Sequence, residues 1–180
     1  MTRQPKDSRW GRSTLGVAAL ALGLLIAPGA FALPSRGQPL PEFSARDLTS
    51  GSHASKELKG RPTLLVVITD KDAGDKMRGW FDAADKHMED SVHRQSIITL
   101  KLPFFVSEGS ARGKAKGQVP QTYWKDTWLD KNGGMAKALG IDTSDTPYVL
   151  ALDAQGRVVA SVHANADSPE ARTIWSALSK

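Results

Sequence analysis

The sequence contains no cysteine, and this absence excludes more functions than any other feature of the chain. Disulfide exchange and peroxide reduction by a protein thiol both require a thiolate, and so does a Cys-ligated metal site. The chain also lacks phosphate-binding glycine motifs and the Gly-x-Ser-x-Gly elbow of serine hydrolases. Its four histidines have no metal-binding spacing: His53, His87, His93 and His163. We therefore expect neither a cofactor nor a bound metal ion.

The first 32 residues have the layout of a secretory signal. Four basic residues precede an apolar run, Leu15 to Ile26, which is too short to be a good membrane span. Small residues at Ala30 and Ala32 suit signal cleavage, so we predict cleavage near Ala32/Leu33. The remaining residues, 33–180, form one predicted domain that is periplasmic or secreted and has no membrane anchor. An uncleaved N-terminal anchor is the alternative.

Most of the positive charge belongs to this N-terminal segment. It holds four basic residues and one acidic residue, so the formal net charge falls from +5 to +2 without it. A domain of such low net charge gives little reason to expect nucleic-acid binding. We therefore predict no nucleic-acid partner.

Hydrophobic periodicity predicts an α/β domain. Residues 42–60 predict a small hairpin and a helical turn, and five later segments have strand character: 63–69, 97–106, 123–130, 148–153 and 157–163. Helical spacing begins at Asp75 and continues for about 18 residues, with His87 and His93 as surface or boundary residues. Shorter helices are predicted at 135–139, ending at Gly140, and after Ser168, which we expect to be an N-cap. The Gly-rich, basic residues 107–118 predict a mobile loop.

Two long segments carry a resemblance to a known superfamily. The stretch "LPEFSARDLTSGSHASKELKGRPTLLVV" resembles the opening of redoxin, TlpA-like and AhpC/TSA-like members of the thioredoxin superfamily, and "TWLDKNGGMAKALGIDTSDTPYVLALDAQGRVV" resembles their second half. The resemblance implies a thioredoxin-like fold: a central mixed sheet of about five strands, flanked by helices, with an N-terminal hairpin extension. Among proteins without cysteine, the layout is similar to that of small exported proteins of the YtfJ type.

The same resemblance implies where a binding edge lies. Pro147 matches the cis-proline beside the active site of the superfamily, and the backbone at Thr146 matches the position that pairs with an extended peptide substrate. From the residues alone, Pro147 is an ordinary proline at the start of a strand. Both interpretations remain open at this point.

The turn "TDKDAGDK" lies where the superfamily carries its redox motif. In one register the two cysteine positions are Asp72 and Asp75, and in the other they are Ala73 and Lys76. Neither register supplies a thiol, so redox activity does not transfer. An aspartate here, Asp72 or Asp75, would act as an N-cap of the following helix.

Two chemical alternatives exist for the same aspartates. An apolar strand followed by Asp70-x-Asp72 is typical of haloacid-dehalogenase-type phosphatases, with Asp70 as the nucleophile and Asp72 as the acid/base. Asp70, Asp72 and Asp75 also form an oxygen-rich cluster that suits calcium. The residues that either site further requires are not found, because Gly74 replaces a Thr or Val and Phe81 replaces the twelfth-position Glu of an EF-hand loop.

Two further groups of side chains are candidates for binding. Four aromatic residues either frame an apolar groove or, as we favour, belong to the core: Trp80, Tyr123, Trp124 and Trp128. Three basic residues either contact an acidic partner or, as we favour, are solvated in a loop: Arg112, Lys114 and Lys116.

The leading functional hypothesis is an exported, redox-inactive thioredoxin-like domain that binds a protein or peptide. The candidate surface consists of Asp70, Asp72, Asp75, Thr146 and Pro147, with the three basic residues as a weaker candidate. The alternative is an enzyme on the same scaffold that uses no thiol of its own. It would act either on thiol-related substrates such as glutathione or by hydrolysis through Asp72.

The absence of cysteine generates the first prediction. The purified, metal-free chain from residue 33 onward should catalyse neither insulin disulfide reduction nor peroxide removal, because it has no thiolate to attack either substrate. Reduction of insulin in the presence of a reductant and consumption of peroxide measure these activities. A rate above that of the protein-free reaction in either assay contradicts the prediction.

Overall fold

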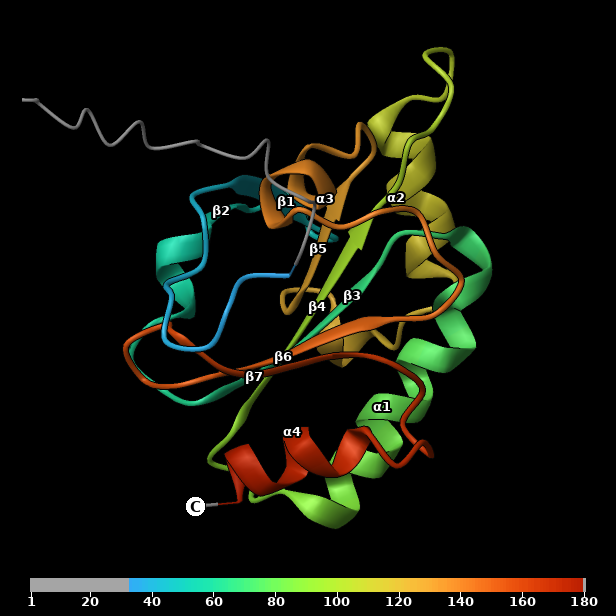
Figure 1. Ribbon diagram of the computed structural model, residues 1–180. Coiled ribbons are helices and arrows are strands. Elements are labelled where there is room, and N and C mark those ends of the chain that lie inside the picture. Colours follow the sequence, from blue (N-terminus) through green and yellow to red (C-terminus); the bar gives the residue numbers. More distant parts are fainter. Residues whose placement is uncertain (1–32, 180) are drawn as a thin grey trace, which may run out of the picture.

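Helices cover both faces of one mixed β-sheet, as Figure 1 shows for the computed structural model of the chain. The structure describes residues 33–179, so the predicted signal sequence and its cleavage site lie outside the described residues. The elements in chain order are β1 (Ser44–Asp47), β2 (Ser52–Ala54), η1 (Ser55–Leu58), β3 (Thr63–Ile68), η2 (Lys71–Ala73), α1 (Gly74–His87), β4 (His93–Thr99), α2 (Glu108–Lys116), η3 (Gln121–Tyr123), β5 (Thr127–Asp130), α3 (Gly134–Leu139), β6 (Tyr148–Leu152), β7 (Val158–His163) and α4 (Ala171–Leu178).

The sheet has seven strands in the order β2-β1-β5-β4-β3-β6-β7, where about five were predicted. The two additional strands are the N-terminal hairpin, since β1 pairs with β5 and the hairpin continues the sheet. In the centre, β3 is parallel to β4 and antiparallel to β6, and β4 is parallel to β5. The carboxyl ends of β3, β4 and β5 therefore meet at one edge of the sheet, where β6 begins.

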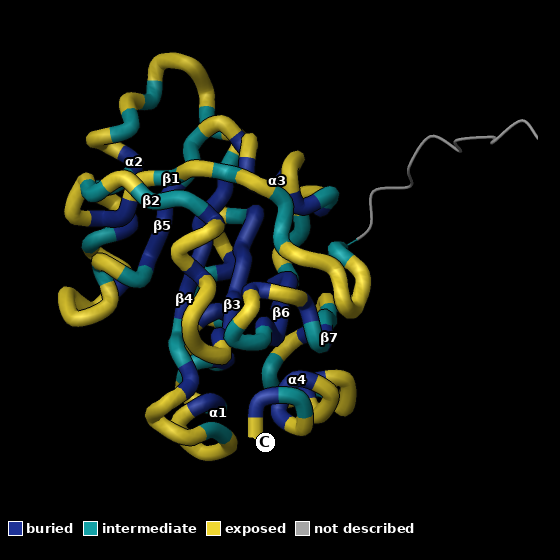
Figure 2. Tube along the Cα trace, turned by 90° about the vertical axis from the view of Figure 1, so that its left-hand side faces the viewer, coloured by how far each residue is buried: buried dark blue, intermediate teal, exposed yellow. Residues whose placement is uncertain are grey.

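Strand β3 lies in the middle of the molecule and is buried along its whole length, as its continuous apolar run predicts (Figure 2). Alternate residues face two separate cores. Leu64 and Val66 pack with the buried residues of α1, α2 and α4, whereas Leu65 and Val67 pack with α3 and η1. At the centre of the first core, Trp80 contacts Trp175 and its indole Nε1 donates to the carbonyl of Ala164 at 3.0 Å.

Residues 107–118, predicted as a mobile loop, form helix α2 instead. The Ser107 side chain accepts a hydrogen bond from the Ser110 N–H at 3.0 Å and so caps the helix. Ala111 and Ala115, four residues apart, are buried against the core. Burial of this small apolar face stabilises a helix whose composition gives little indication of one, and the prediction was wrong for this reason.

Other boundaries also differ from the predictions. Helix α1 ends at His87, because Met88 adopts an extended conformation, and His93 is therefore the first residue of β4 and not a helical residue. Strand β4 begins four residues before the predicted segment and ends at Thr99, and β5 is limited to Thr127–Asp130. The helix predicted to start with Ser168 as its cap begins only at Ala171. The helix stop at Gly140 is confirmed, with φ of 68°.

A chain of charged side chains holds the N-terminal hairpin together. Asp47, at the end of β1, is buried and accepts three hydrogen bonds at one carboxylate oxygen, from the backbone and hydroxyl of Thr49 and from the Gly51 N–H. His53 on β2 places Nε2 2.9 Å from the other oxygen of Asp47 and Nδ1 2.8 Å from the Glu57 carboxylate. Its ring stacks on Trp128 at a centroid distance of 5.0 Å. An imidazole donates from both nitrogens only when it is protonated.

The pKa values of this cluster follow from these contacts. Burial opposes the charged form of His53, but its hydrogen bonds to Asp47 and Glu57 outweigh burial and raise its pKa above 6.5. Burial likewise opposes the charge on Asp47, yet the hydrogen bonds from His53, Thr49 and Gly51 lower its pKa below 3.8. The hydrogen bond from His53 lowers the pKa of Glu57 below 4.5. At a pH above the pKa values of the two carboxyl groups and below the pKa of His53, the side chains of Asp47, Glu57 and His53 are therefore all charged.

The cluster should stabilise the fold most between pH 4.5 and pH 6.5. A raised histidine pKa gives stability that is complete below 6.5 and is lost as the pH rises through the folded-state pKa; lowered carboxyl pKa values give stability that is lost at acid pH. Replacing His53→Phe should therefore cost on the order of 1 kcal/mol more at about pH 5.5 than at about pH 8.5. Urea unfolding at both pH values measures the difference. His87→Phe on α1 is the matched control, and a cost of His53→Phe that is independent of pH contradicts the prediction.

Candidate functional site

The candidate site residues converge at the edge of the sheet where β3 and β4 end. Because these strands are parallel and β6 runs antiparallel to β3, four parts of the chain meet there (Figure 1). We call this surface the carboxyl edge and define it as residues 69–76, 100–107, 142–147 and His163. The predicted residues Asp70, Asp72, Asp75, Thr146 and Pro147 all lie on it.

Asp70 caps the turn that leads into α1. It has an extended backbone, and its side chain accepts a hydrogen bond from the Asp72 N–H at 2.8 Å at the start of the η2 turn. The prediction that Asp72 or Asp75 is the cap was wrong, because the 3-10 turn η2 precedes α1 and moves the capping position to Asp70. The Asp72 carboxylate instead contacts the Lys71 ammonium at 2.7 and 2.8 Å. This hydrogen bond raises the pKa of Lys71, and both side chains are exposed to solvent.

The Thr69 hydroxyl joins this turn to the segment that leads into β6. It accepts a hydrogen bond from the Ser144 N–H at 2.8 Å and donates one to the Ser144 carbonyl at 3.2 Å. Next to this contact, the Lys76 ammonium lies 2.7 Å from the Asp145 carboxylate. The hydrogen bond from Lys76 lowers the pKa of Asp145. The turn where the resemblance places the superfamily's redox motif is therefore a capped turn beside an ion pair.

The backbone at Thr146 is already bonded within the chain. Its N–H donates to the Ser144 hydroxyl at 3.0 Å, and its carbonyl lies 3.2 Å from His163 Nε2. The peptide bond that precedes Pro147 is trans, as are all others in residues 33–179, so the cis form that the resemblance implies is not present. Trans is the lower-energy form of an X-Pro bond. Pairing of a peptide with the Thr146 N–H would first have to displace the Ser144 hydroxyl.

Ser144 and His163 form a hydrogen-bonded pair at the same edge, at 2.9 Å, with the His163 ring stacked on Tyr148 at 4.0 Å. A Ser-His pair serves nucleophilic catalysis when a third group orients the histidine. The histidine–carboxylate pairs of the described residues involve His53 and His93, not His163. The pair thus lacks the acid of a triad, and the hydroxyl also accepts from Thr146 N–H.

Sequence reasoning missed two aromatic side chains on this edge. Phe104 and Phe105 are 94% and 75% exposed and contact each other edge to face at a centroid distance of 5.6 Å. They lie on the loop between β4 and α2, which projects from the molecule in Figure 1. The sequence places them in a predicted strand, but Pro103 immediately before them is the signal that the strand has already ended.

The remaining candidates are the three basic residues of α2 and the four aromatic residues. Of the basic residues, Arg112 pairs with Glu108, Lys116 lies over the Trp124 ring at 4.5 Å, and Lys114 is exposed, so two of the three are engaged within the chain. Trp80 and Trp128 are buried, which confirms the core interpretation for them, and Tyr123 is exposed.

Residues 33–179 offer neither a metal-binding cluster nor a membrane-spanning helix. Within residues 33–179, no three histidine, aspartate or glutamate side chains lie close enough together to hold a metal ion. No helix in that range has the length and apolar character needed to cross a bilayer.

Comparison with known proteins gives structural matches only. No protein-family model matches the sequence, and no curated protein does. Among solved structures, a thiol:disulfide interchange protein DsbE from Chlorobium tepidum has a TM-score of 0.59 and 17% identity, over 81% of this chain and 99% of that one. The exposed lipoprotein thioredoxin of Streptococcus pneumoniae has a TM-score of 0.50 and 13% identity, over 75% and 98%. Peroxidoxin BcpB from Mycobacterium tuberculosis has a TM-score of 0.54 and 15% identity, over 81% of this chain and 96% of that one.

The chain therefore has a thioredoxin-like α/β fold, as the resemblance implies, with seven strands in its sheet. Structural neighbours at this level of identity establish the fold and not the activity. The absence of cysteine is consistent with redox inactivity.

Proposed function

We propose that the chain is an exported, redox-inactive thioredoxin-like domain that binds a protein or peptide at its carboxyl edge. The observation that carries the proposal is the exposure of Phe104 and Phe105 on that edge. Large apolar side chains in contact with each other and with water usually mark an interaction site. The signal-like N-terminal segment supports export, and the missing thiol supports a role other than catalysis of disulfide exchange.

The rest of the edge supplies polar groups that suit a peptide. The Asp70 turn, the Lys76–Asp145 pair and the Ser144 hydroxyl give charged and hydrogen-bonding groups of both signs on the same edge of the sheet as the apolar loop. An exposed apolar anchor with polar groups around it is the usual arrangement of a protein interface. Because the Thr146 N–H is already bonded, side-chain contacts through the two phenylalanines carry more of the binding than backbone pairing does.

The proposal predicts that the phenylalanine pair is needed for partner capture. Burial of one phenylalanine side chain is worth about 1.5–3 kcal/mol, so the double variant Phe104→Ser/Phe105→Ser should lose roughly 100-fold or more in affinity. The experiment is affinity capture from the exported compartment with the full chain, followed by titration of the recovered partner. Because both side chains are exposed, the folded state of the variant should remain intact.

Tyr123→Ser is the matched control. Tyr123 is also an exposed aromatic residue, but it precedes β5 and so lies at the opposite edge of the sheet. Capture should be retained in this variant and should be the same with and without reductant. A partner that binds the double variant as tightly as the unmodified chain would overturn the proposal.

A further inference from the structure

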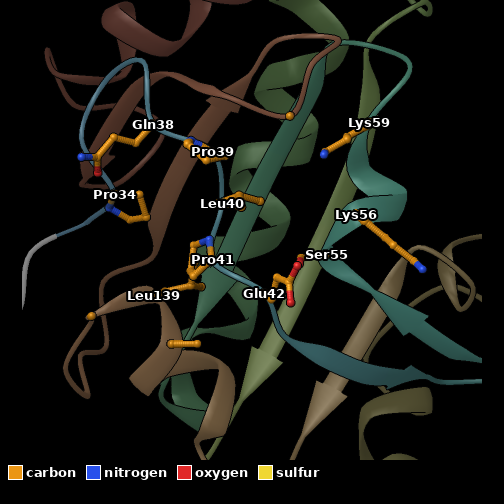
Figure 3. A pocket seen from close by; sticks show the side chains of 13 residues that line it. Pro34, Gln38, Pro39, Leu40, Pro41, Glu42, Ser55, Lys56, Lys59 and Leu139 are labelled. Carbon is orange, nitrogen blue, oxygen red and sulfur yellow. The ribbon is translucent and has the colours of Figure 1, made fainter.

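An open cavity of about 600 Å³ lies on the face of the sheet that η1 and α3 cover. Its walls are the N-terminal segment 34–42, which we call the strap, together with η1 and the end of α3 (Figure 3). Lys59, just before β3, and Gly156, in the β6–β7 turn, lie at one end of the cavity, because the start of β3 pairs with the end of β6. Ligand cavities in proteins have volumes of about 300–1,000 Å³.

The strap is fixed to the sheet and forms a permanent wall. Gly37 N–H donates to the Val158 carbonyl at 2.7 Å, Val158 N–H donates to the Gln38 carbonyl at 2.9 Å, and Leu40 N–H donates to the Gly156 carbonyl at 3.3 Å. The Arg157 guanidinium adds a hydrogen bond to the Gly37 carbonyl at 3.2 Å. The cavity is therefore present without a ligand to order it, which lowers the entropic cost of binding.

The apolar lining comes mainly from the strap and α3. Six of the lining residues are aliphatic or proline, and Leu139 among them is itself almost fully buried: Pro34, Pro39, Leu40, Pro41, Ala138 and Leu139. In Figure 3 the three strap residues Pro39, Leu40 and Pro41 line one side of the cavity in succession. This wall can cover an apolar ligand body along its length.

Lys59 supplies a positive charge to the same cavity. Figure 3 shows its ammonium group reaching towards the strap, whereas the Lys56 side chain points away from it. The aliphatic part of Lys59 lies over Gly156, where a Cβ atom would come within 3.0 Å of the Lys59 Cγ. Gly156 has a φ of +73°, so the turn conformation and the lysine contact both favour glycine there.

The charge on Lys59 is not compensated by a neighbouring residue. Neither Lys59 nor Glu42, the one carboxylate of the lining, belongs to an ion pair within residues 33–179. A lysine outside any ion pair of residues 33–179, beside an apolar wall, is complementary to a ligand with one anionic end and an apolar body.

We propose that this cavity binds a small apolar carboxylate, with its anionic group at Lys59 and its apolar body against Leu40 and the prolines. The inference is independent of the function proposed for the carboxyl edge. Binding at one site requires no contact with the other.

Octanoate is the probe, and 1-octanol is its uncharged counterpart. Titration of the chain from residue 33 onward, followed by amide chemical shifts in NMR spectra, should show saturable binding of octanoate with shifts at Leu40, Lys59 and Leu139. Lys59→Met keeps the aliphatic stem and removes the charge, so it should weaken octanoate binding about fivefold, because an exposed ion pair contributes up to about 1 kcal/mol. 1-Octanol should bind more weakly than octanoate.

Lys56→Met is the matched control, since it removes the same charge from a side chain that points away, and it should change the affinity by less than about twofold. Glu42→Gln removes the negative charge of the lining and should strengthen binding. Shifts confined to the Phe104–Phe105 loop, equal effects of the two lysine variants, or an absence of saturation would each overturn the proposal.

Discussion

The Thr69 hydroxyl makes the contact on which the carboxyl edge depends. It is buried at the end of β3 and exchanges two hydrogen bonds with the backbone of Ser144, a residue 75 positions later in the chain. One side chain thus fixes the turn after β3 against the segment that leads into β6. The Lys76–Asp145 ion pair and the Ser144–His163 contact both lie on the segments that Thr69 brings together. Surface ion pairs stabilise little by themselves, so the buried hydroxyl and the strand pairing are what position them.

The edge shows what a thioredoxin-like fold retains when it has no thiol. In a thiol enzyme the start of α1 stabilises a thiolate through its backbone N–H groups and the helix dipole. Here Asp70 satisfies an N–H group of the turn that leads into α1, and the neighbouring charges are paired as Lys71–Asp72 and Lys76–Asp145. The turn carries two further carboxylates, Asp70 and Asp75, which belong to no ion pair within residues 33–179. Phe104 and Phe105 on the neighbouring loop are the large apolar side chains that this edge exposes to water.

Much of the fold could be predicted because its signals are local. The apolar run of β3, the β6–β7 hairpin and the stop of α3 at Gly140 each follow from residues adjacent in the sequence. Helix α2 could not, because Ala111 and Ala115 stabilise it only through burial against distant residues. The exposure of Phe104 depends on where β4 stops pairing with β5. The hydrogen bonds that already engage the Thr146 N–H and carbonyl depend on Ser144 and His163. These facts are set by tertiary contacts, which composition and spacing do not encode.

The most direct measurement is amide hydrogen exchange of the chain with and without a protein recovered by the affinity capture proposed above. Binding at the carboxyl edge predicts slower exchange in the complex for residues 69–76, 100–107 and 142–147, with little change in the strap. The loop at Phe104 and Phe105 should show the largest change, because its amides outside regular structure exchange readily in the free chain. Protection confined to the strap or to the β2 edge of the sheet, with the carboxyl edge unchanged, would contradict binding at this surface.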